Sequence, residues 1–395
     1  MSQPFSKTIE DDFIDEEDII AKFQYLENVT ERYPYRPLSN SAAYSFSDRV
    51  GNAMTKLPEE HKRAALALFA NTIYIPDPIL DEAWREATYS IRKKLNGKST
   101  VNFLDSLYLA VDNDGLINIF SGVANIEGRE DHNLNPGFNS VSGIINELFT
   151  LIESKKQSPD LQKIITMMKK KNWIILSDNS ISGGSLASDI KKLMKIRSIL
   201  YPKGETAPFL QKDTQPPQIY AVVQLITEQA LLTLDEVLPK TNIAYGLEFD
   251  EGMRISSGRC SLFNKDSTRE AVRKLCEWFG NNFFLDQHNP NFRARIREHV
   301  QKGGQDNYAF GWKNCGYTIV TQNNALSNSV PVIYHRPPSV EGVSSDENRG
   351  AAYEPPFPRI ESRIYHEISP DSSRLGIIEE WKNIDYLQTC LYRNK

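Results

Sequence analysis

The chain has 395 residues, which corresponds to one to three domains at roughly 150 residues per domain. Hydrophobic residues make up 40% of it, enough for a sizeable core, and 21 Gly and 21 Pro are ordinary usage that excludes a low-complexity or collagenous chain. The formal net charge of −5 argues against a protein that mainly coats duplex DNA, because neutralising phosphates requires a basic surplus.

No stretch approaches 18 consecutive apolar residues, so no transmembrane helix and no membrane partner are expected. The N-terminus is acidic and lacks an apolar stretch, which does not fit a signal or transit peptide. The four cysteines are widely spaced and form no CxxC pair, which disfavours a disulfide framework or a structural zinc site. We therefore expect a protein of the reducing cytoplasm.

The first region, residues 1–100, is predicted to be helical. An acidic stretch precedes its first helix and suits the positive end of a helix dipole, and Pro58 with two following acids marks another helix start. Pro76 and Pro78 are expected to break that helix before it resumes. The predicted helices cover residues 14–25, 64–72 and 81–95.

In the second region, residues 101–337, apolar strands alternate with helices of about a dozen residues. This alternation implies right-handed βαβ units, so the expected fold class is α/β with a parallel sheet. The predicted strands cover residues 103–111, 116–123, 173–176, 220–226, 242–249, 318–321 and 330–334. The predicted helices cover residues 141–154, 161–171, 185–200, 228–238 and 267–279.

The third region, residues 338–395, is a C-terminal extension. Its first part is rich in Pro, Ser, Glu and Arg, a composition typical of an extended connector. A last amphipathic helix is expected near residues 375–393, where it would pack on the core or on a partner.

One segment, WIILSDNSISGGSLASDI at residues 173–190, indicates phosphate binding. An apolar strand leads through an acidic residue to a Ser/Gly loop that opens directly into a helix. Glycines let the backbone approach an anion closely, and free N–H groups at the positive helix end supply donors. No Lys follows the glycines, so the loop is not a Walker A motif, and it lacks the GxGxxG spacing. The alternative reading is an ordinary strand-to-helix turn.

This segment resembles the phosphoribosyl-pyrophosphate-binding loop of type I phosphoribosyltransferases. In that family two consecutive acids after the strand bind the ribose hydroxyls, and a Ser/Thr-Gly loop holds the 5′-phosphate. The resemblance puts Ser177 and Asp178 at the two acidic positions, with Asp178 as the catalytic residue, and Ser177 departs from the family pattern. The implied phosphate loop consists of Ser182, Gly183, Gly184 and Ser185.

A second segment, residues 308–334, is similar to the C-terminal part of phosphoribosyltransferase-like domains from bacterial conflict and antiphage systems, including those beside retron reverse transcriptases. The matching features are an Asn-rich turn and a Pro-apolar exit at Pro331. The resemblance covers roughly residues 101–337 and implies ligand contacts by Asn323, Asn324 and Asn328. Turn formation is the alternative role of these three residues.

The predicted pocket lies at the carboxyl ends of the strands, where ligands bind in open α/β sheets. Its expected edges are the ends of four predicted strands, at residues 103–111, 173–176, 220–226 and 318–321. Asp112 and Asp114, in the turn after the first of these strands, are candidates to hold Mg²⁺ with a pyrophosphate, because Mg²⁺ prefers oxygen ligands. A plain turn is the alternative for these two residues.

Other chemically suggestive residues have simpler explanations. Arg293 and Arg297 are i,i+4 neighbours that would suit nucleic-acid phosphates, but a solvated helix face is favoured in an acidic chain. Cys315 has no base in a motif relation to it, so a packed free cysteine is favoured over a nucleophile. A surface role is the default for His132.

These observations support two hypotheses. The first is a phosphoribosyltransferase-like effector of a bacterial antiphage defence system, which would bind a phosphoribosyl pyrophosphate-like nucleotide with Mg²⁺ and act at the ribose anomeric carbon. The second is a catalytically degenerate subunit of a defence complex that senses a nucleotide or binds RNA or protein, as the loss of an acid at Ser177 suggests. A nucleobase-salvage enzyme is disfavoured, because such enzymes are usually half this size.

Overall fold

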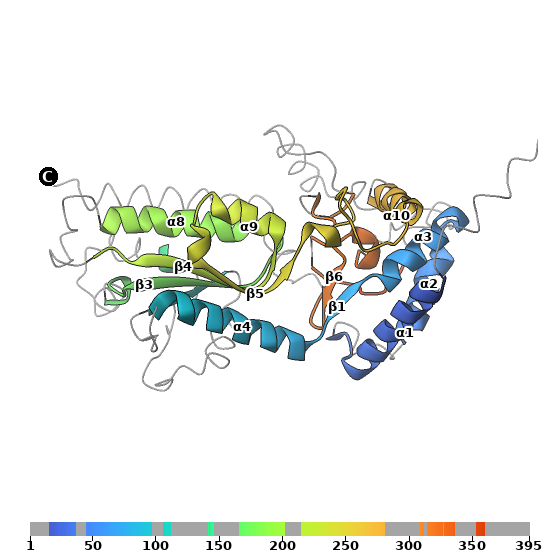
Figure 1. The fold of residues 1–395 in the computed structure, drawn as a ribbon, viewed down its shortest axis with the longest axis horizontal. Helices are drawn as coiled ribbons and strands as arrows, with labels where there is room; N and C mark the ends of the chain where they lie inside the picture. Colours follow the sequence, from blue (N-terminus) through green and yellow to red (C-terminus); the bar gives the residue numbers. More distant parts are fainter. Residues whose placement is uncertain are drawn as a thin grey trace, which may run out of the picture. The chain divides into compact units, whose positions relative to one another are not determined.

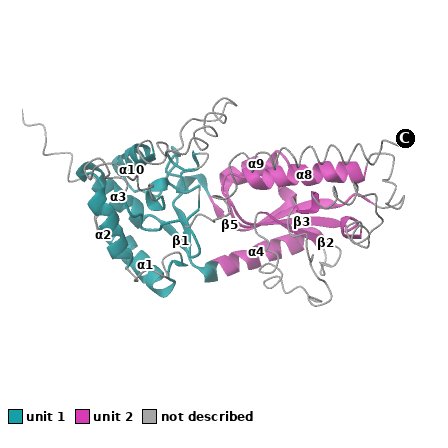
Figure 2. Ribbon diagram, turned by 180° about the vertical axis from the view of Figure 1, so that it is seen from behind, with its two compact units in different colours: residues 1–79, 250–362 teal, residues 80–249, 363–395 magenta. Residues whose placement is uncertain are grey.

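The computed structural model describes residues 16–36, 45–96, 106–111, 141, 143–145, 166–201, 215–280, 309–311, 314–326, 328–335 and 353–359. Figure 1 shows how these residues fold. The chain divides into two compact units, coloured separately in Figure 2. Unit 1 comprises Met1–Ile79 and Asp250–Ser362, and unit 2 comprises Leu80–Phe249 and Arg363–Lys395.

Unit 2 contains a four-stranded sheet in the order β2-β3-β4-β5, in which every neighbouring pair is parallel. This arrangement confirms the predicted α/β class with a parallel sheet. The strands are β2 (Ser106–Ala110), β3 (Asn172–Ser180), β4 (Gln218–Thr227) and β5 (Ile243–Phe249).

Helices cover both faces of this sheet (Figure 1). The helix α4 (Asp77–Asn96) lies on one face, and α8 (Gly184–Leu200) and α9 (Glu228–Asp235) lie on the other. Side chains along β3 alternate between two clusters, so that Trp173 packs on the α8 side and Ile174 packs with Trp84 of α4. A central parallel strand needs apolar residues on both faces, and this explains the unbroken apolar run of β3.

The close packing of β5 against α4 requires a glycine. A Cβ atom added to Gly246 would lie 1.9 Å from the backbone oxygen of Ala83, so no other residue fits unless strand and helix separate. At the far end of the same contact, the ammonium group of Lys94 donates hydrogen bonds to the carbonyl oxygens of Lys240 and Ile243. Strand and helix are thus held in backbone contact.

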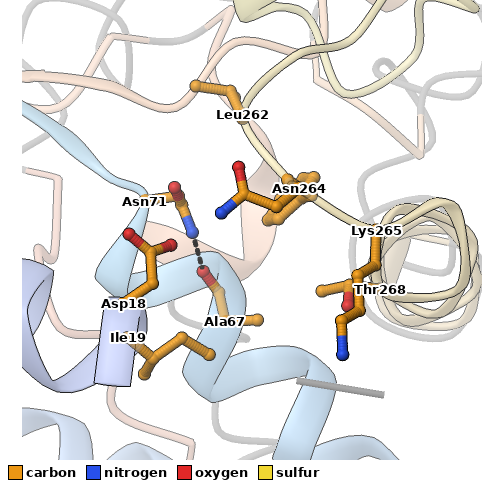
Figure 3. Close-up of a pocket in the computed structure, with 9 residues that line it drawn as sticks. Asp18, Ile19, Ala67, Asn71, Leu262, Asn264, Lys265 and Thr268 are labelled. Carbon is orange, nitrogen blue, oxygen red and sulfur yellow. Dashed lines mark hydrogen bonds between the residues drawn. The ribbon is translucent and has the colours of Figure 1, made fainter. Parts of the chain in front are cut away.

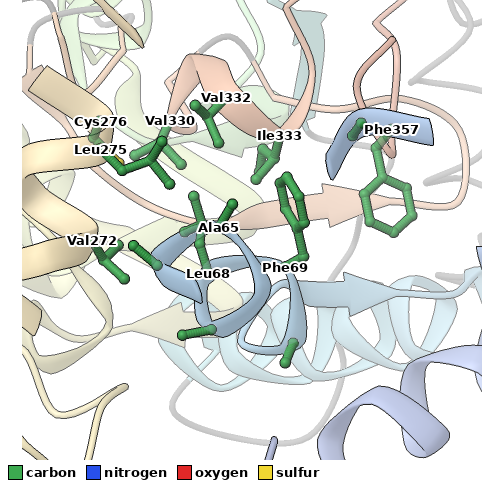
Figure 4. Close-up of a cluster of buried hydrophobic side chains, with 14 of the residues drawn as sticks. Ala65, Leu68, Phe69, Val272, Leu275, Cys276, Val330, Val332, Ile333 and Phe357 are labelled. Carbon is green, nitrogen blue, oxygen red and sulfur yellow. The ribbon is translucent and has the colours of Figure 1, made fainter. Parts of the chain in front are cut away.

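Unit 1 builds one core from two distant parts of the chain. Figure 4 shows side chains of α3, including Phe69, gathered with those of α10 and with Val330, Ile333 and Phe357. A parallel pair of short strands, β1 and β6, completes the unit. Its described elements are α1 (Glu16–Arg32), α2 (Phe46–Lys56), α3 (Glu59–Ala70), β1 (Ile73–Ile75), α10 (Asp266–Phe279) and β6 (Ile319–Thr321).

One strand prediction in unit 1 is wrong, and another strand belongs to a different sheet than expected. Residues 330–334 contain the 3₁₀ turn Pro331–Ile333 instead of a strand, since Pro331 fixes the backbone at its first position and lacks a ladder N–H. The strand near 318–321 exists as β6, but it pairs with β1 and not with the main sheet. Its end therefore does not belong to the sheet edge at which the pocket was expected.

The helix predicted at 81–95 begins earlier than expected. Pro78 lies in the first turn of α4, where a missing N–H costs no intrahelical hydrogen bond. The regional boundaries were predicted at residues 100 and 337, whereas unit 1 joins the N-terminal helices with α10 and with residues 330–334, Tyr353 and Phe357, which pack on the apolar faces of those helices. Within the described ranges, no helix combines the length and apolar character needed to cross a bilayer.

Several sequence predictions fall outside the described residues. They are the strand at 116–123, the basic face of Arg293 and Arg297, His132, the C-terminal helix at 375–393, and most of the helices at 141–154 and 161–171. These stay predictions.

Replacement of Gly246 by Ala should destabilise unit 2, because the new methyl group would overlap the Ala83 carbonyl. We expect a loss of about 3 kcal/mol in the free energy of unfolding, measured by urea denaturation. Gly51→Ala is the matched control: Gly51 lies inside α2 with open space around it, and the change should gain about 0.5–1 kcal/mol. Equal stability of the two variants would contradict this contact.

Candidate functional site

The Ser/Gly segment forms a very short turn at the carboxyl end of β3. The strand continues past the predicted end at residue 176 to Ser180, and α8 begins at Gly184, so only residues 181–183 connect them. Ser182 and Gly183 therefore lie in the turn, while Gly184 and Ser185 lie in the first turn of the helix. The structure thus brings the four predicted phosphate-loop residues together at one edge of the sheet.

Gly183 is required at this turn for two reasons. Its φ angle is 74°, in the left-handed region that favours glycine. Its α-carbon also packs on α9, since an added Cβ would lie 2.8 Å from the Cβ of Thr233 and 3.0 Å from the oxygen of Ala230. The turn is therefore pressed against the neighbouring helix.

The helix start that follows this turn presents backbone donors. The first intrahelical bond runs from the N–H of Ala187 to the oxygen of Gly183, at 2.9 Å. The N–H groups of Gly184, Ser185 and Leu186 precede it, so helix geometry provides them with no acceptor. Within the described part of the chain, no side chain caps this end and no acid lies in the first turn. The uncapped N–H groups and the positive end of the helix dipole attract an anion at this position.

The two residues at the predicted acidic positions differ in what surrounds them. Ser177 is buried, and its hydroxyl donates to the carbonyl oxygen of Asn179 at 2.8 Å. Asp178 is half-buried, and one carboxylate oxygen accepts the backbone N–H of Asn179 at 2.7 Å and its side-chain amide at 2.9 Å. Asn179 thus holds the Asp178 carboxylate in place, and the Ser177 hydroxyl bonds the backbone of the same strand.

Thr227 also shapes this edge of the sheet, although it was not among the residues predicted from the sequence. It is fully buried at the end of β4, and its hydroxyl donates to the carbonyl oxygen of Ile181 in the turn at 2.6 Å. The same hydroxyl accepts the N–H of Ala230 at 3.1 Å and so caps α9. The sequence signal that could have identified Thr227 is a threonine between a predicted strand and a helix that begins with an acidic residue.

The predicted asparagines belong to unit 1, whereas Asp178 and the Ser/Gly turn belong to unit 2. The side-chain oxygen of Asn324 accepts the N–H of Ala325 at 3.0 Å. The amide of Asn323 donates to Asp77 at 3.2 Å and accepts from the guanidinium of Arg36.

The third asparagine, Asn328, donates to the sulfur of Cys315 at 3.3 Å. All three asparagine side chains therefore make contacts that hold unit 1 together, as their alternative role in turns would require. Their ligand role stays a prediction.

Unit 1 has a pocket near the start of α10, shown in Figure 3. Asn71 lies at its wall, with its side-chain amide donating to the oxygen of Ala67 at 2.8 Å, and Asp18, Asn264 and Lys265 lie around it. The cavity volume of about 20 Å³ has room for a water molecule. It is far too small for a nucleotide.

The candidate magnesium ligands Asp112 and Asp114 lie outside the described residues. Among the residues that the structure describes, no group of three or more His, Cys, Asp and Glu side chains is arranged to hold a metal ion. The involvement of Mg²⁺ therefore stays a prediction.

The cysteines of unit 1 have the surroundings of packed thiols. Cys260, Cys276 and Cys315 are all buried. Burial raises the pKa of the Cys276 thiol strongly and that of Cys260 as well, which keeps both thiols protonated at neutral pH. Cys315 is completely buried, and its sulfur accepts the hydrogen bond from Asn328, as expected of a packed cysteine.

Comparison with known proteins identifies a family. The family model PRTase-CE matches residues 55–359 of the chain. No curated protein and no solved structure matches the chain.

The buried thiols should be inert in the folded protein. In a Cys390→Ser background, we expect a thiol reagent at pH 8 to modify Cys260, Cys276 and Cys315 slowly, because all three are buried and burial also raises the pKa of Cys260 and Cys276. Urea should expose all three to rapid modification, which mass spectrometry would locate. Rapid labelling of Cys315 in the folded chain would instead support a nucleophilic role.

Proposed function

Because the chain belongs to the PRTase-CE family and has a phosphoribosyltransferase-like domain with a parallel α/β sheet, we propose that it binds a phosphoribosyl pyrophosphate-like nucleotide as a cytoplasmic effector of bacterial antiphage defence. The observation that carries the proposal is the Ser/Gly turn between β3 and α8. Its left-handed glycine, backbone donors and serine hydroxyls form a cradle for one phosphate group.

The ligand's 5′-phosphate would lie against the first turn of α8. The N–H groups of Gly184, Ser185 and Leu186 would donate to its oxygens, together with the hydroxyls of Ser182 and Ser185. Ser185 is exposed and Ser182 half-buried, so ligand oxygens can reach both hydroxyls. Hydrogen bonds to a charged group typically contribute about 1.5–3 kcal/mol each, which is sufficient for micromolar affinity.

Asp178 would bind the ribose hydroxyls and orient the anomeric carbon. In the transfer reaction, the bond from this carbon to the pyrophosphate oxygen breaks, the bonding electrons leave with the pyrophosphate, and an acceptor nucleophile forms the new bond. Mg²⁺ bound to the pyrophosphate oxygens would neutralise charge on the leaving group, with Asp112 and Asp114 as candidate ligands. The protein's own contribution is orientation by Asp178 and the phosphate turn.

A second candidate function is nucleotide sensing without transfer, as part of a defence complex with a protein or RNA partner. The observation that favours it is Ser177: this buried hydroxyl bonds the Asn179 carbonyl at the position of the first acid, which leaves Asp178 as the carboxylate of the pair. Such a site would hold the ligand without the full set of groups that orient the ribose for reaction.

Calorimetric titration of phosphoribosyl pyrophosphate with Mg²⁺ tests the binding site. The unmodified protein should bind with micromolar affinity, and Ser182→Ala/Ser185→Ala should weaken binding at least tenfold, about 1.4 kcal/mol, because two donors are lost. The matched control is Ser198→Ala, an exposed hydroxyl on the same helix that bonds the Lys195 carbonyl. No binding by the folded, unmodified protein would overturn the proposal.

Release of inorganic pyrophosphate separates the two candidate functions. If the protein transfers the phosphoribosyl group, release should be detectable with water or an added nucleophile, and Asp178→Asn should reduce it at least a hundredfold. Asp235→Asn, which alters a half-exposed carboxylate at the end of α9, is the control and should leave the rate unchanged. Binding without release would favour the sensing function.

A further inference from the structure

Thr227 lies where three elements of unit 2 meet. It ends β4, it caps α9, and its hydroxyl reaches the turn between β3 and α8. The side chain is fully buried, so ligand and solvent do not reach it in the folded protein. Any influence of Thr227 on the site must therefore act through the backbone groups that it bonds.

The two hydrogen bonds of Thr227 use one hydroxyl as both donor and acceptor. The proton goes to the carbonyl oxygen of Ile181 at 2.6 Å, and the oxygen accepts from the N–H of Ala230 at 3.1 Å. A hydroxyl that accepts from one group is polarised toward donation to the other, so the two bonds reinforce each other. The Ile181 carbonyl is consequently tied to the first turn of α9.

A second contact from α9 meets the same turn two residues later. Gly183 packs against Ala230 and Thr233, so closely that a Cβ would come within 2.8 Å of Thr233. The turn of residues 181–183 is thus held at both ends, by the hydrogen bond from Thr227 at Ile181 and by steric contact with α9 at Gly183. These restraints fix the direction in which α8 starts, and with it the direction of its first N–H groups.

We propose that Thr227 is a positioning residue of the phosphate turn, and that it aligns the N–H groups of Gly184, Ser185 and Leu186 toward the ligand's phosphate. The inference rests on the proposed function as far as the ligand is concerned. The restraint of the turn by the Thr227 hydroxyl does not depend on any ligand. Without the hydroxyl, the Ile181 carbonyl and the Ala230 N–H would be buried without partners, and the turn would shift toward water to satisfy them.

The test compares Thr227→Val, which removes the hydroxyl at nearly constant shape, with Thr227→Ser, which keeps it. Thr88→Val is the matched control: Thr88 is also buried in unit 2, but its hydroxyl bonds the Trp84 carbonyl of its own helix. The ligand-free readout is hydrogen–deuterium exchange at the Ala187 amide, which bonds Gly183. The ligand readout is the affinity for phosphoribosyl pyrophosphate with Mg²⁺ by calorimetry.

We expect Thr227→Val to raise exchange at the start of α8 at least tenfold and to weaken binding about tenfold. Thr227→Ser should restore both values, and Thr88→Val should change neither. Unchanged exchange in Thr227→Val, no rescue by Ser, or an equal effect of Thr88→Val would each overturn the positioning role. If the unmodified protein binds no ligand, the proposed function fails, and the exchange data still decide the role of Thr227.

Discussion

The central constraint on unit 2 is that β3 must be covered on both faces at once. Its residues alternate between a cluster under α8 and a cluster under α4, so the strand has no solvated face along its apolar part. Polar groups are tolerated only where the strand leaves this double layer. The change from Leu176 to Ser177 marks that point, and the Asp178 carboxylate and the Ser/Gly turn follow within seven residues. The place of the candidate site is therefore a consequence of how the sheet is buried.

Much of unit 2 was predictable from sequence, because its signals are local and agree with one another. The apolar run at Trp173, the paired glycines and the following helix pattern together predicted β3, the turn and α8. The length of the turn was not predictable: β3 continues to Ser180 because residues 177–180 still pair with β4 despite their polarity. Thr227 went unnoticed for a similar reason, since its importance depends on a contact with Ile181, 46 residues away.

Unit 1 was less predictable, because its signals are spread along the chain. The strand β1 has three residues, and its partner β6 lies far away in sequence, so nothing local distinguished Ile73 from the end of a helix. The asparagines near residue 323 were predicted as ligand contacts from a resemblance. In the structure, the side chain of Asn323 contacts Arg36 and Asp77, and a sequence pattern alone does not distinguish such an internal contact from ligand binding. The ligand role of the asparagines therefore stays a prediction.

Unit 1 consists of two chain segments, Met1–Ile79 and Asp250–Ser362, and this has a consequence for its folding during translation. The N-terminal helices leave the ribosome with their apolar faces uncovered, because α10 is translated about two hundred residues after α3, and Phe357 nearly three hundred residues after it. At roughly 5–20 residues per second, that delay lasts on the order of ten seconds or more. The larger part of unit 2, Leu80–Phe249, is translated during this interval, and its folding would shorten the effective loop that unit 1 must close. Nascent chains therefore expose α1 to α3 for a defined period, in which a chaperone or a partner chain has its best access to them.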